Sequence, residues 1–96
     1  MLKIPKDVIK EIESVYDDIV VTYKTSSKID DYEYTIYDVV YNGAKLFTLN
    51  VSKIIFKSGR TDIDYTLVTD IEIDCYQTPY IDDFKRNVIR YIKKII

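Results

Sequence analysis

Apolar and polar side chains alternate along residues 61–76. Most odd-numbered positions of this run are apolar, among them Ile63, Tyr65 and Leu67. Five even-numbered positions carry carboxylates, namely Asp62, Asp64, Asp70, Glu72 and Asp74. A period of two over such a length predicts one long β-strand. Its apolar side would lie in the core, and its carboxylates would form an outward row about 6.6–6.8 Å apart.

Two segments, one near each end of the sequence, have the spacing of amphipathic helices. Over residues 4–16 apolar side chains recur every three or four positions, and Pro5 suits a first helical turn. Thr78 and Pro79 are typical of an N-cap and a first helical position, so a second helix is predicted to follow them. Its predicted buried stripe consists of Ile81, Phe84, Val88, Ile92 and Ile95.

Further strands are predicted between the helices. The β-branched and aromatic run 19–23 predicts a short strand, residues 25–31 a polar loop, and residues 32–41 a second strand. A third strand is expected to end at a loop over residues 58–60. Lys53 falls on the apolar side of that strand, where either its side chain snorkels or a nearby bulge shifts the phase.

The Asn42-Gly43 pair is the strongest turn signal in the chain. It favours a two-residue type I′ hairpin, because both central positions of that turn require a positive φ. The register that follows turns Tyr34 and Ile36 toward the core and Tyr37 outward, which gives one apolar and one polar side.

These elements predict an α+β fold in the order α-β-β-β-β-α. It has two layers: a four-stranded antiparallel meander carries the N- and C-terminal helices on one apolar face and leaves the other face in water. Hairpins and terminal helices need no crossover connection. A length of 96 residues suits one domain, so residues 1–96 are expected to form a single unit.

Composition excludes several kinds of chemistry. The chain has no His and one Cys, which excludes the common zinc frameworks and the Ser-His-Asp and Cys-His catalytic sets. No Gly-rich phosphate-binding motif is present. We therefore expect a protein that is not an enzyme and that needs no cofactor or metal. The sequence shows neither a transmembrane run nor a signal peptide, and its lone Cys75 fits a reducing compartment, so a cytoplasmic location is expected.

The net charge of −2 hides separate acidic and basic blocks. Residues 61–84 contain seven carboxylates and no Lys or Arg. Three interpretations of the acidic strand stay open: protection of a sheet edge against aggregation, a face that binds a basic groove by mimicking phosphates, and a cation site. Alternate residues of one strand converge poorly on a single ion, which counts against the cation site. Tyr37, Tyr41 and Tyr76 are expected to face outward near the carboxylates and to supply contact area to a partner.

The C-terminal helix is basic, with Lys85, Arg86, Arg90, Lys93 and Lys94. Such a helix can track phosphates or lie on an anionic membrane, but lysines near a helix end also complement its dipole. No aromatic residues are interleaved in the manner of single-strand binders. We therefore expect no membrane partner, and direct nucleic-acid binding ranks only third among the functions considered.

Sixteen isoleucines and ten tyrosines, without Trp or His, match the residue usage of AT-rich codons, which suggests a low-GC bacterium, its phages and plasmids, or an archaeal virus. In size, acidity and helix–sheet–helix order the chain resembles the small anti-CRISPR inhibitors that phages and archaeal viruses direct against host defence. The resemblance covers the whole length and involves no diagnostic residue. It implies an inhibitor or adaptor whose acidic, Tyr-bearing sheet face blocks a basic, nucleic-acid-binding surface of a host defence complex in the host cytoplasm. The alternative is a structural or homodimeric module or an immunity protein.

Overall fold

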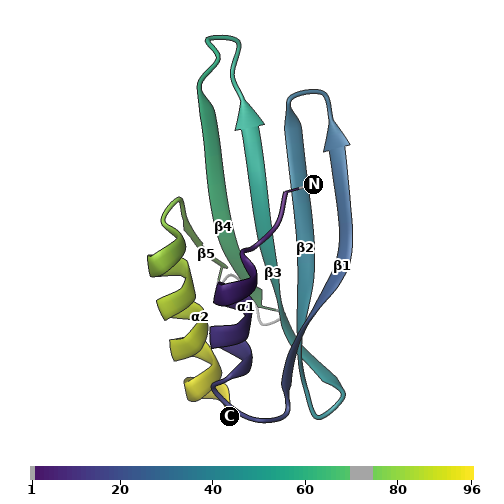
Figure 1. The fold of residues 1–96 in the computed structure, drawn as a ribbon, viewed down its shortest axis with the longest axis vertical. Helices are drawn as coiled ribbons and strands as arrows, with labels where there is room; N and C mark the ends of the chain where they lie inside the picture. The colour runs from purple at the N-terminus through teal and green to yellow at the C-terminus, as the bar shows by residue number, and fades with distance from the viewer. Residues whose placement is uncertain (1, 70–74) are drawn as a thin grey trace.

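The computed structural model describes residues 2–69 and 75–96 of the chain. In chain order its elements are α1 (Lys6–Glu13), β1 (Ile19–Ile29), β2 (Tyr32–Tyr41), β3 (Ala44–Ile55), β4 (Thr61–Thr69), β5 (Cys75–Thr78) and α2 (Ile81–Ile95). In the described residues the strands form one antiparallel sheet in the order β1-β2-β3-β4-β5, and both helices lie against the same face (Figure 1). The predicted α+β meander with terminal helices is therefore confirmed, with five strands in place of four.

The additional strand arises because residues 61–76 do not form one strand. β4 ends at Thr69, and β5 begins at Cys75 and runs antiparallel to β4, with Leu67 opposite Tyr76. The prediction of a continuous strand was wrong because a period of two persists through a reversal that no Gly, Pro or Asn marks. Three of the predicted site residues, Asp70, Glu72 and Asp74, lie outside the described residues, as does Ile71.

The β2–β3 hairpin confirms the predicted turn and corrects the predicted facing. Asn42 and Gly43 have φ of 51° and 81°, as a type I′ turn requires. The register then shifts between Val39 and Val40, because one additional residue of β3 is accommodated in a bulge. The odd-numbered residues of β2, which were predicted to face outward, therefore lie on the same side of the sheet as Phe47, Leu49 and Val51 of β3. Thr35, Tyr37 and Val39 are therefore buried under the helices.

The two neighbouring hairpins also differ from expectation. β1 continues to Ile29, which pairs with Tyr32, so the predicted loop over residues 25–31 reduces to a two-residue turn. In the β3–β4 hairpin Ile55 pairs with Thr61, and the register runs without a shift past Lys53. Lys53 therefore lies on the same side as Val51, and a bulge does not correct its phase.

The core lies between the helices and the part of the sheet that they cover, which is the lower half in Figure 1. It consists of Ile4, Val8, Ile12, Ile19, Tyr37, Val39, Phe47, Leu49, Val51, Leu67, Phe84, Val88 and Ile92. From the predicted stripe of α2, Ile95 is exposed, and Thr78 ends β5 instead of capping the helix. Edge-to-face packing of Tyr91 on Phe47, with ring centroids 5.2 Å apart, joins α2 to β3.

The segment before α1 is held against the sheet by hydrogen bonds. The Ile4 N–H donates to the Tyr37 hydroxyl oxygen at 3.2 Å, and the Thr35 hydroxyl donates to the Leu2 carbonyl oxygen at 2.6 Å. The Leu2 N–H donates to a Glu33 carboxylate oxygen at 3.1 Å. The side chains of Glu33, Thr35 and Tyr37 thereby fix the position of the segment that leads into α1.

Candidate protein-binding surface

The sheet face opposite the helices, which we call the open face, is formed by alternate residues of the strands. Residues paired across neighbouring strands lie on the same face of a sheet. One row of such pairs crosses four strands, from Ile29 through Tyr32 and Ile54 to Asp62. The next row contains Ser27, Tyr34, Ser52 and Asp64. The open face therefore brings aromatic and aliphatic side chains next to two of the predicted carboxylates.

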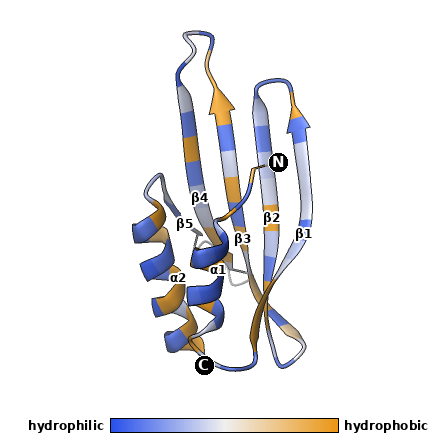
Figure 2. Cartoon of the chain, viewed as in Figure 1, coloured by the Kyte–Doolittle hydropathy of each residue, from blue (hydrophilic) through white to orange (hydrophobic). Residues whose placement is uncertain are grey.

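Large apolar side chains gather at one end of the open face. We define the distal patch as Ile29, Tyr32, Tyr34, Ile36 and Ile54. Ile29 is 65% exposed, Tyr32 38% and Ile54 41%. The rings of Tyr32 and Tyr34 lie against each other, with centroids 5.7 Å apart. Figure 2 shows hydrophobic colour at the upper ends of β1 and β3, beyond the part of the sheet that the helices cover. Exposed apolar groups that adjoin one another are typical of an interaction surface.

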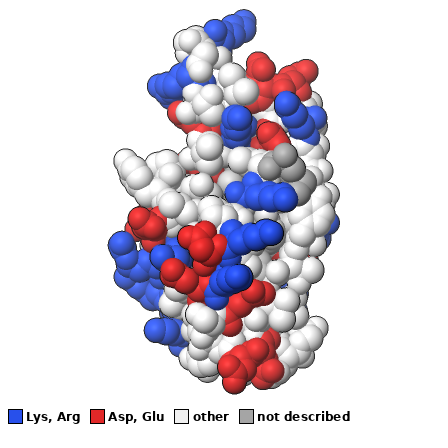
Figure 3. Space-filling view, in the orientation of Figure 1, with Lys and Arg blue, Asp and Glu red and all other residues white. Residues whose placement is uncertain are grey.

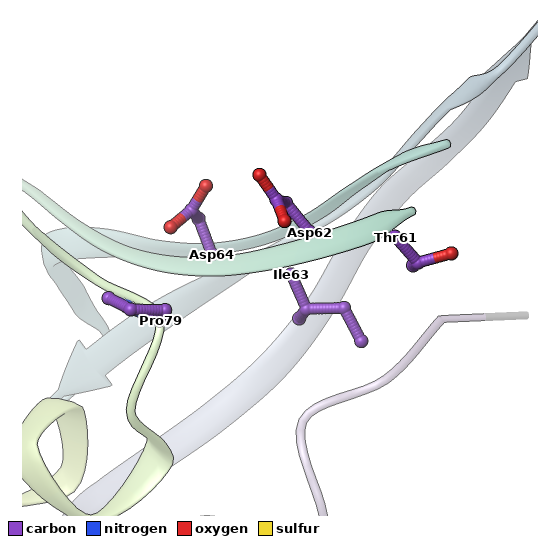
Figure 4. Close-up of a pocket in the computed structure, with 5 residues that line it drawn as sticks. All are labelled: Thr61, Asp62, Ile63, Asp64 and Pro79. Atoms are coloured by element: carbon purple, nitrogen blue, oxygen red, sulfur yellow. The ribbon is translucent and has the colours of Figure 1, made fainter. Parts of the chain in front are cut away.

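The carboxylates of Asp62 and Asp64 border the distal patch on β4. Figure 4 shows both on one side of the strand, with Thr61 and Ile63 on the other side. The Asp62 carboxylate lies 2.9 Å from the guanidinium of Arg60, which stacks 4.8 Å above the ring of Phe56. Asp64 has no ion-pair partner among the described residues. The predicted facing of these two carboxylates is thus correct.

The three predicted contact tyrosines, in contrast, face the helices. Tyr37 is 5% exposed, so the expectation that it faces outward is wrong. Tyr41 and Tyr76 are half-buried and pack against the core, and Tyr41 also meets Tyr16 edge to face. Tyr32 and Tyr34 take the outward positions instead. Their facing was missed because the bulged residue of β3, opposite Val39 and Val40, shifts the phase of β3 relative to β2, and the sequence gives no separate signal for that bulge.

Tyr76 has a specific partner on the helix side of the sheet. Its hydroxyl donates a hydrogen bond to the carboxylate of Asp83 in the first turn of α2. This hydrogen bond raises the pKa of Tyr76 above that of an ordinary tyrosine, because it favours the protonated phenol. The same bond lowers the pKa of Asp83, because it stabilises the ionised carboxylate. Tyr76 therefore joins β5 to α2 and is not available as an outward contact.

The basic residues of α2 are partly paired within the protein. Lys85 Nζ lies 2.9 Å from a Glu11 carboxylate oxygen of α1, and this hydrogen bond raises the pKa of Lys85. Arg86 lies 3.6 Å from Asp83. Figure 3 shows basic and acidic side chains interspersed over the helices. Among the described residues of the helix-bearing side, acidic groups thus interrupt the positive charge, whereas phosphate tracking favours a uniform positive stripe.

A hollow lies beside the first residues of β4. Thr61, Asp62, Ile63, Asp64 and Pro79 line it (Figure 4). Within residues 2–69 and 75–96, no three Asp, Glu, Cys or His side chains are grouped so that they could hold a metal ion. In the same part of the chain no helix has the length and apolar character needed to cross a membrane.

Comparisons with protein-family models, with curated proteins and with solved structures find no match to this chain.

Proposed function

We propose that this protein is a small non-enzymatic inhibitor or adaptor that docks the open face of its sheet on a basic, nucleic-acid-binding surface of another protein. A viral or phage origin would make that partner a component of host defence in the host cytoplasm, as in the anti-CRISPR proteins. The observation that carries the proposal is the distal patch bordered by Asp62 and Asp64. It combines apolar contact area with negative charge on one uncovered face.

Each part of this surface has a physical role in the proposal. Tyrosines bury a large area at a low entropic cost and are enriched among the residues that dominate interface energies. Tyr32 and Tyr34 also hold each other in place, so less side-chain freedom is lost on binding. Carboxylates at the border steer a basic partner and raise its association rate, an effect that salt weakens.

The test begins with affinity capture from the host and identification of the partner by mass spectrometry. Association rates are then measured at two salt concentrations for the double variant Asp62→Lys/Asp64→Lys. A matched control, Asp17→Lys/Asp18→Lys, changes the net charge equally at exposed positions in the connection between α1 and β1. Circular dichroism verifies that both variants are folded.

We expect the first variant to associate at least about tenfold more slowly at low salt and the control to change less than about twofold. Tyr32→Ala should mainly raise the dissociation rate, because it removes contact area. Equal slowing in both double variants would assign the effect to net charge and overturn the proposed site. An unchanged rate for Asp62→Lys/Asp64→Lys would leave these carboxylates as edge protection.

Two other functions remain as alternatives. The distal patch could pair two copies of the chain in a homodimeric or immunity module, and sedimentation at several concentrations would reveal that dimer. Nucleic-acid binding through α2 is third, because Glu11 and Asp83 already neutralise two of its cations. That function predicts the loss of binding on substituting Arg86 and Arg90, and no loss on reversing the charge of Asp62 and Asp64.

A further inference from the structure

The outer edge of β4 is paired along only part of its length. β5 pairs with residues 65–68 of β4, so in the described structure residues 61–64 have β3 on one side and no strand on the other. β5 ends at Thr78, and Pro79, which has no N–H, follows as the chain turns toward α2. The hollow between β4 and Pro79 lies along this unpaired edge.

Hydrogen bonds at the end of β3 show in which direction the main-chain groups point. The Ile55 N–H donates to the Asp31 carbonyl oxygen at 2.9 Å, on the β2 side. The Phe56 N–H donates to the Arg60 carbonyl oxygen at 2.8 Å, on the β4 side. Successive residues of a strand point their main-chain groups to opposite sides, so even-numbered residues of β3 bond to β4.

The same alternation assigns the groups of β4. Asp62 and Asp64 oppose even-numbered residues of β3 and therefore bond to that strand. Thr61 and Ile63 consequently direct both their N–H and their C=O groups to the open edge. Two donors and two acceptors thus lie in a row, in line with the groups that bond to β5.

The other edge of the sheet is protected along its first half. The Ile19 N–H donates to the Tyr16 carbonyl oxygen at 3.2 Å, and the Val21 N–H donates to a Glu13 carboxylate oxygen at 2.9 Å. A register shift between Tyr23 and Thr25 then distorts this edge. Satisfied donors and bulges are two means of preventing strand addition, and residues 61–64 of β4 show neither in the described structure. Their protection is charge: the carboxylates of Asp62 and Asp64 repel an acidic strand but not a basic one.

Side chains around the open edge of β4 define the segment that would fit. A strand added there would place alternate side chains beside the carboxylates of Asp62, which Arg60 already contacts, and Asp64, which has no ion-pair partner among the described residues. Lysine or arginine is therefore favoured above all beside Asp64. The side chains between them would lie on the face of Ile63, which packs against the core, where apolar groups are favoured. Tyr80, which is 72% exposed, follows Pro79 at the end of the hollow and offers further contact area.

We infer that the open edge of β4 binds an extended segment with alternating basic and apolar residues as an added strand, in line with β5. Main-chain hydrogen bonds to Thr61 and Ile63 supply affinity, and the side chains of Asp62, Asp64 and Ile63 supply selectivity. The inference rests on the proposed function for the basic character of the partner. It adds that the partner contributes an exposed strand or tail.

The first test is an NMR titration with a capped pentapeptide of alternating lysine and valine. We expect the amides of Thr61 and Ile63 to shift and to become protected from hydrogen exchange, and those of Asp62 and Asp64 to keep their protection. A peptide with glutamate in place of lysine should bind at least about tenfold more weakly, because it meets like charge. The lysine peptide with N-methyl groups on the edge-facing amides should also lose binding.

A variant of the protein tests the main-chain contact directly. Thr61→Pro removes one edge-facing donor, and proline is tolerated at the first residue of a strand and on a free edge. We expect about fivefold weaker peptide binding, the effect of one net hydrogen bond. Thr61→Val keeps the N–H and should bind the peptide as the unchanged protein does.

The possible failures are distinguishable. Peptide binding that is indifferent to N-methylation overturns strand addition, whereas the proposed function stands if Asp62→Lys/Asp64→Lys still slows capture of the whole partner. Failure of both tests removes the proposed function as well. If the chain alone forms a dimer that Thr61→Pro dissociates, the edge pairs with a second copy, and the inference of a basic peptide is wrong.

Discussion

Replacing Tyr37 with phenylalanine tests the facing of β2, on which the assignment of the open face depends. The aromatic ring remains, so the core keeps its packing, and the hydroxyl alone is lost. The structure places that hydroxyl 3.2 Å from the N–H of Ile4, a residue that is 2% exposed. Leaving a buried donor without a partner costs about 1–3 kcal/mol, so the free energy of unfolding should fall by that amount.

Urea unfolding followed by circular dichroism measures this change. For a small domain, a loss of about 2 kcal/mol lowers the urea midpoint by about 1 M. Tyr41→Phe is the matched control, since the hydroxyl of Tyr41 has no hydrogen-bond partner among the described residues. It should change the free energy of unfolding by less than about 0.5 kcal/mol, the usual surface range.

A second substitution on the same strand strengthens the test. Thr35→Val removes the hydroxyl that donates to the Leu2 carbonyl at 2.6 Å. Because Thr35 and Tyr37 hold the same segment of chain, the double variant should lose less than the sum of the single losses, by about 0.5 kcal/mol or more. If Tyr37→Phe lowered the free energy of unfolding as little as Tyr41→Phe, the hydroxyl of Tyr37 would not hold the segment before α1 against the sheet. Tyr37 could then face outward, and the assignment of Tyr32 and Tyr34 to the open face would fail.

Two further predictions concern α2. Ile92→Ala should lower the free energy of unfolding by about 2–5 kcal/mol, because the side chain is fully buried; a loss below about 0.5 kcal/mol in urea unfolding would contradict its core position. Tyr76→Phe should raise the pKa of Asp83 toward the ordinary carboxyl value, as followed by NMR titration of the carboxyl carbon. A carboxylate with a lowered pKa in the folded state stabilises the protein above its unfolded pKa of about 4 and loses that contribution as the pH falls through the folded pKa. The unchanged protein should therefore lose more stability than Tyr76→Phe below about pH 4, and equal losses would show that the hydrogen bond has no such role.

Local signals in the sequence were sufficient for much of the fold. The apolar stripe of α2 follows from the helical period, and burial of Phe84, Val88 and Ile92 confirms it. Asn42-Gly43 fixes the β2–β3 turn because few other residue pairs tolerate its two positive φ values. Alternation also gives the correct faces of β4: Leu67 is buried, and Asp62 and Asp64 lie on the opposite side of the strand from Ile63.

Features that depend on contacts distant in sequence could not be predicted in this way. The bulge opposite Val39 and Val40 is one such feature: it shifts the phase of β3 relative to β2, so that Tyr34 and not Tyr37 lies on the open face. The facing of β2 is also supported by the hydrogen bonds that join Tyr37 and Thr35 to the segment before α1, and no strand pattern in the sequence reveals these hydrogen bonds. The reversal between β4 and β5 is the other, because the alternating pattern has the same form in a straight strand and in a hairpin. For these two reasons the candidate surface in the structure contains Tyr32 and Tyr34 in place of the predicted Tyr37, Tyr41 and Tyr76.

The position of the helices at the two ends of the chain has a consequence for folding kinetics. Every strand pairs with its neighbours in sequence, so the described sheet can form through short loop closures. The contact between Glu11 of α1 and Lys85 of α2 instead joins segments that the whole sheet separates. We expect the Asn42-Gly43 hairpin to form before the transition state and the helix–helix contact to form after it. Substitutions in the turn would then slow folding, whereas Glu11→Gln would chiefly accelerate unfolding, so the two ends of the chain would govern how long the folded state persists.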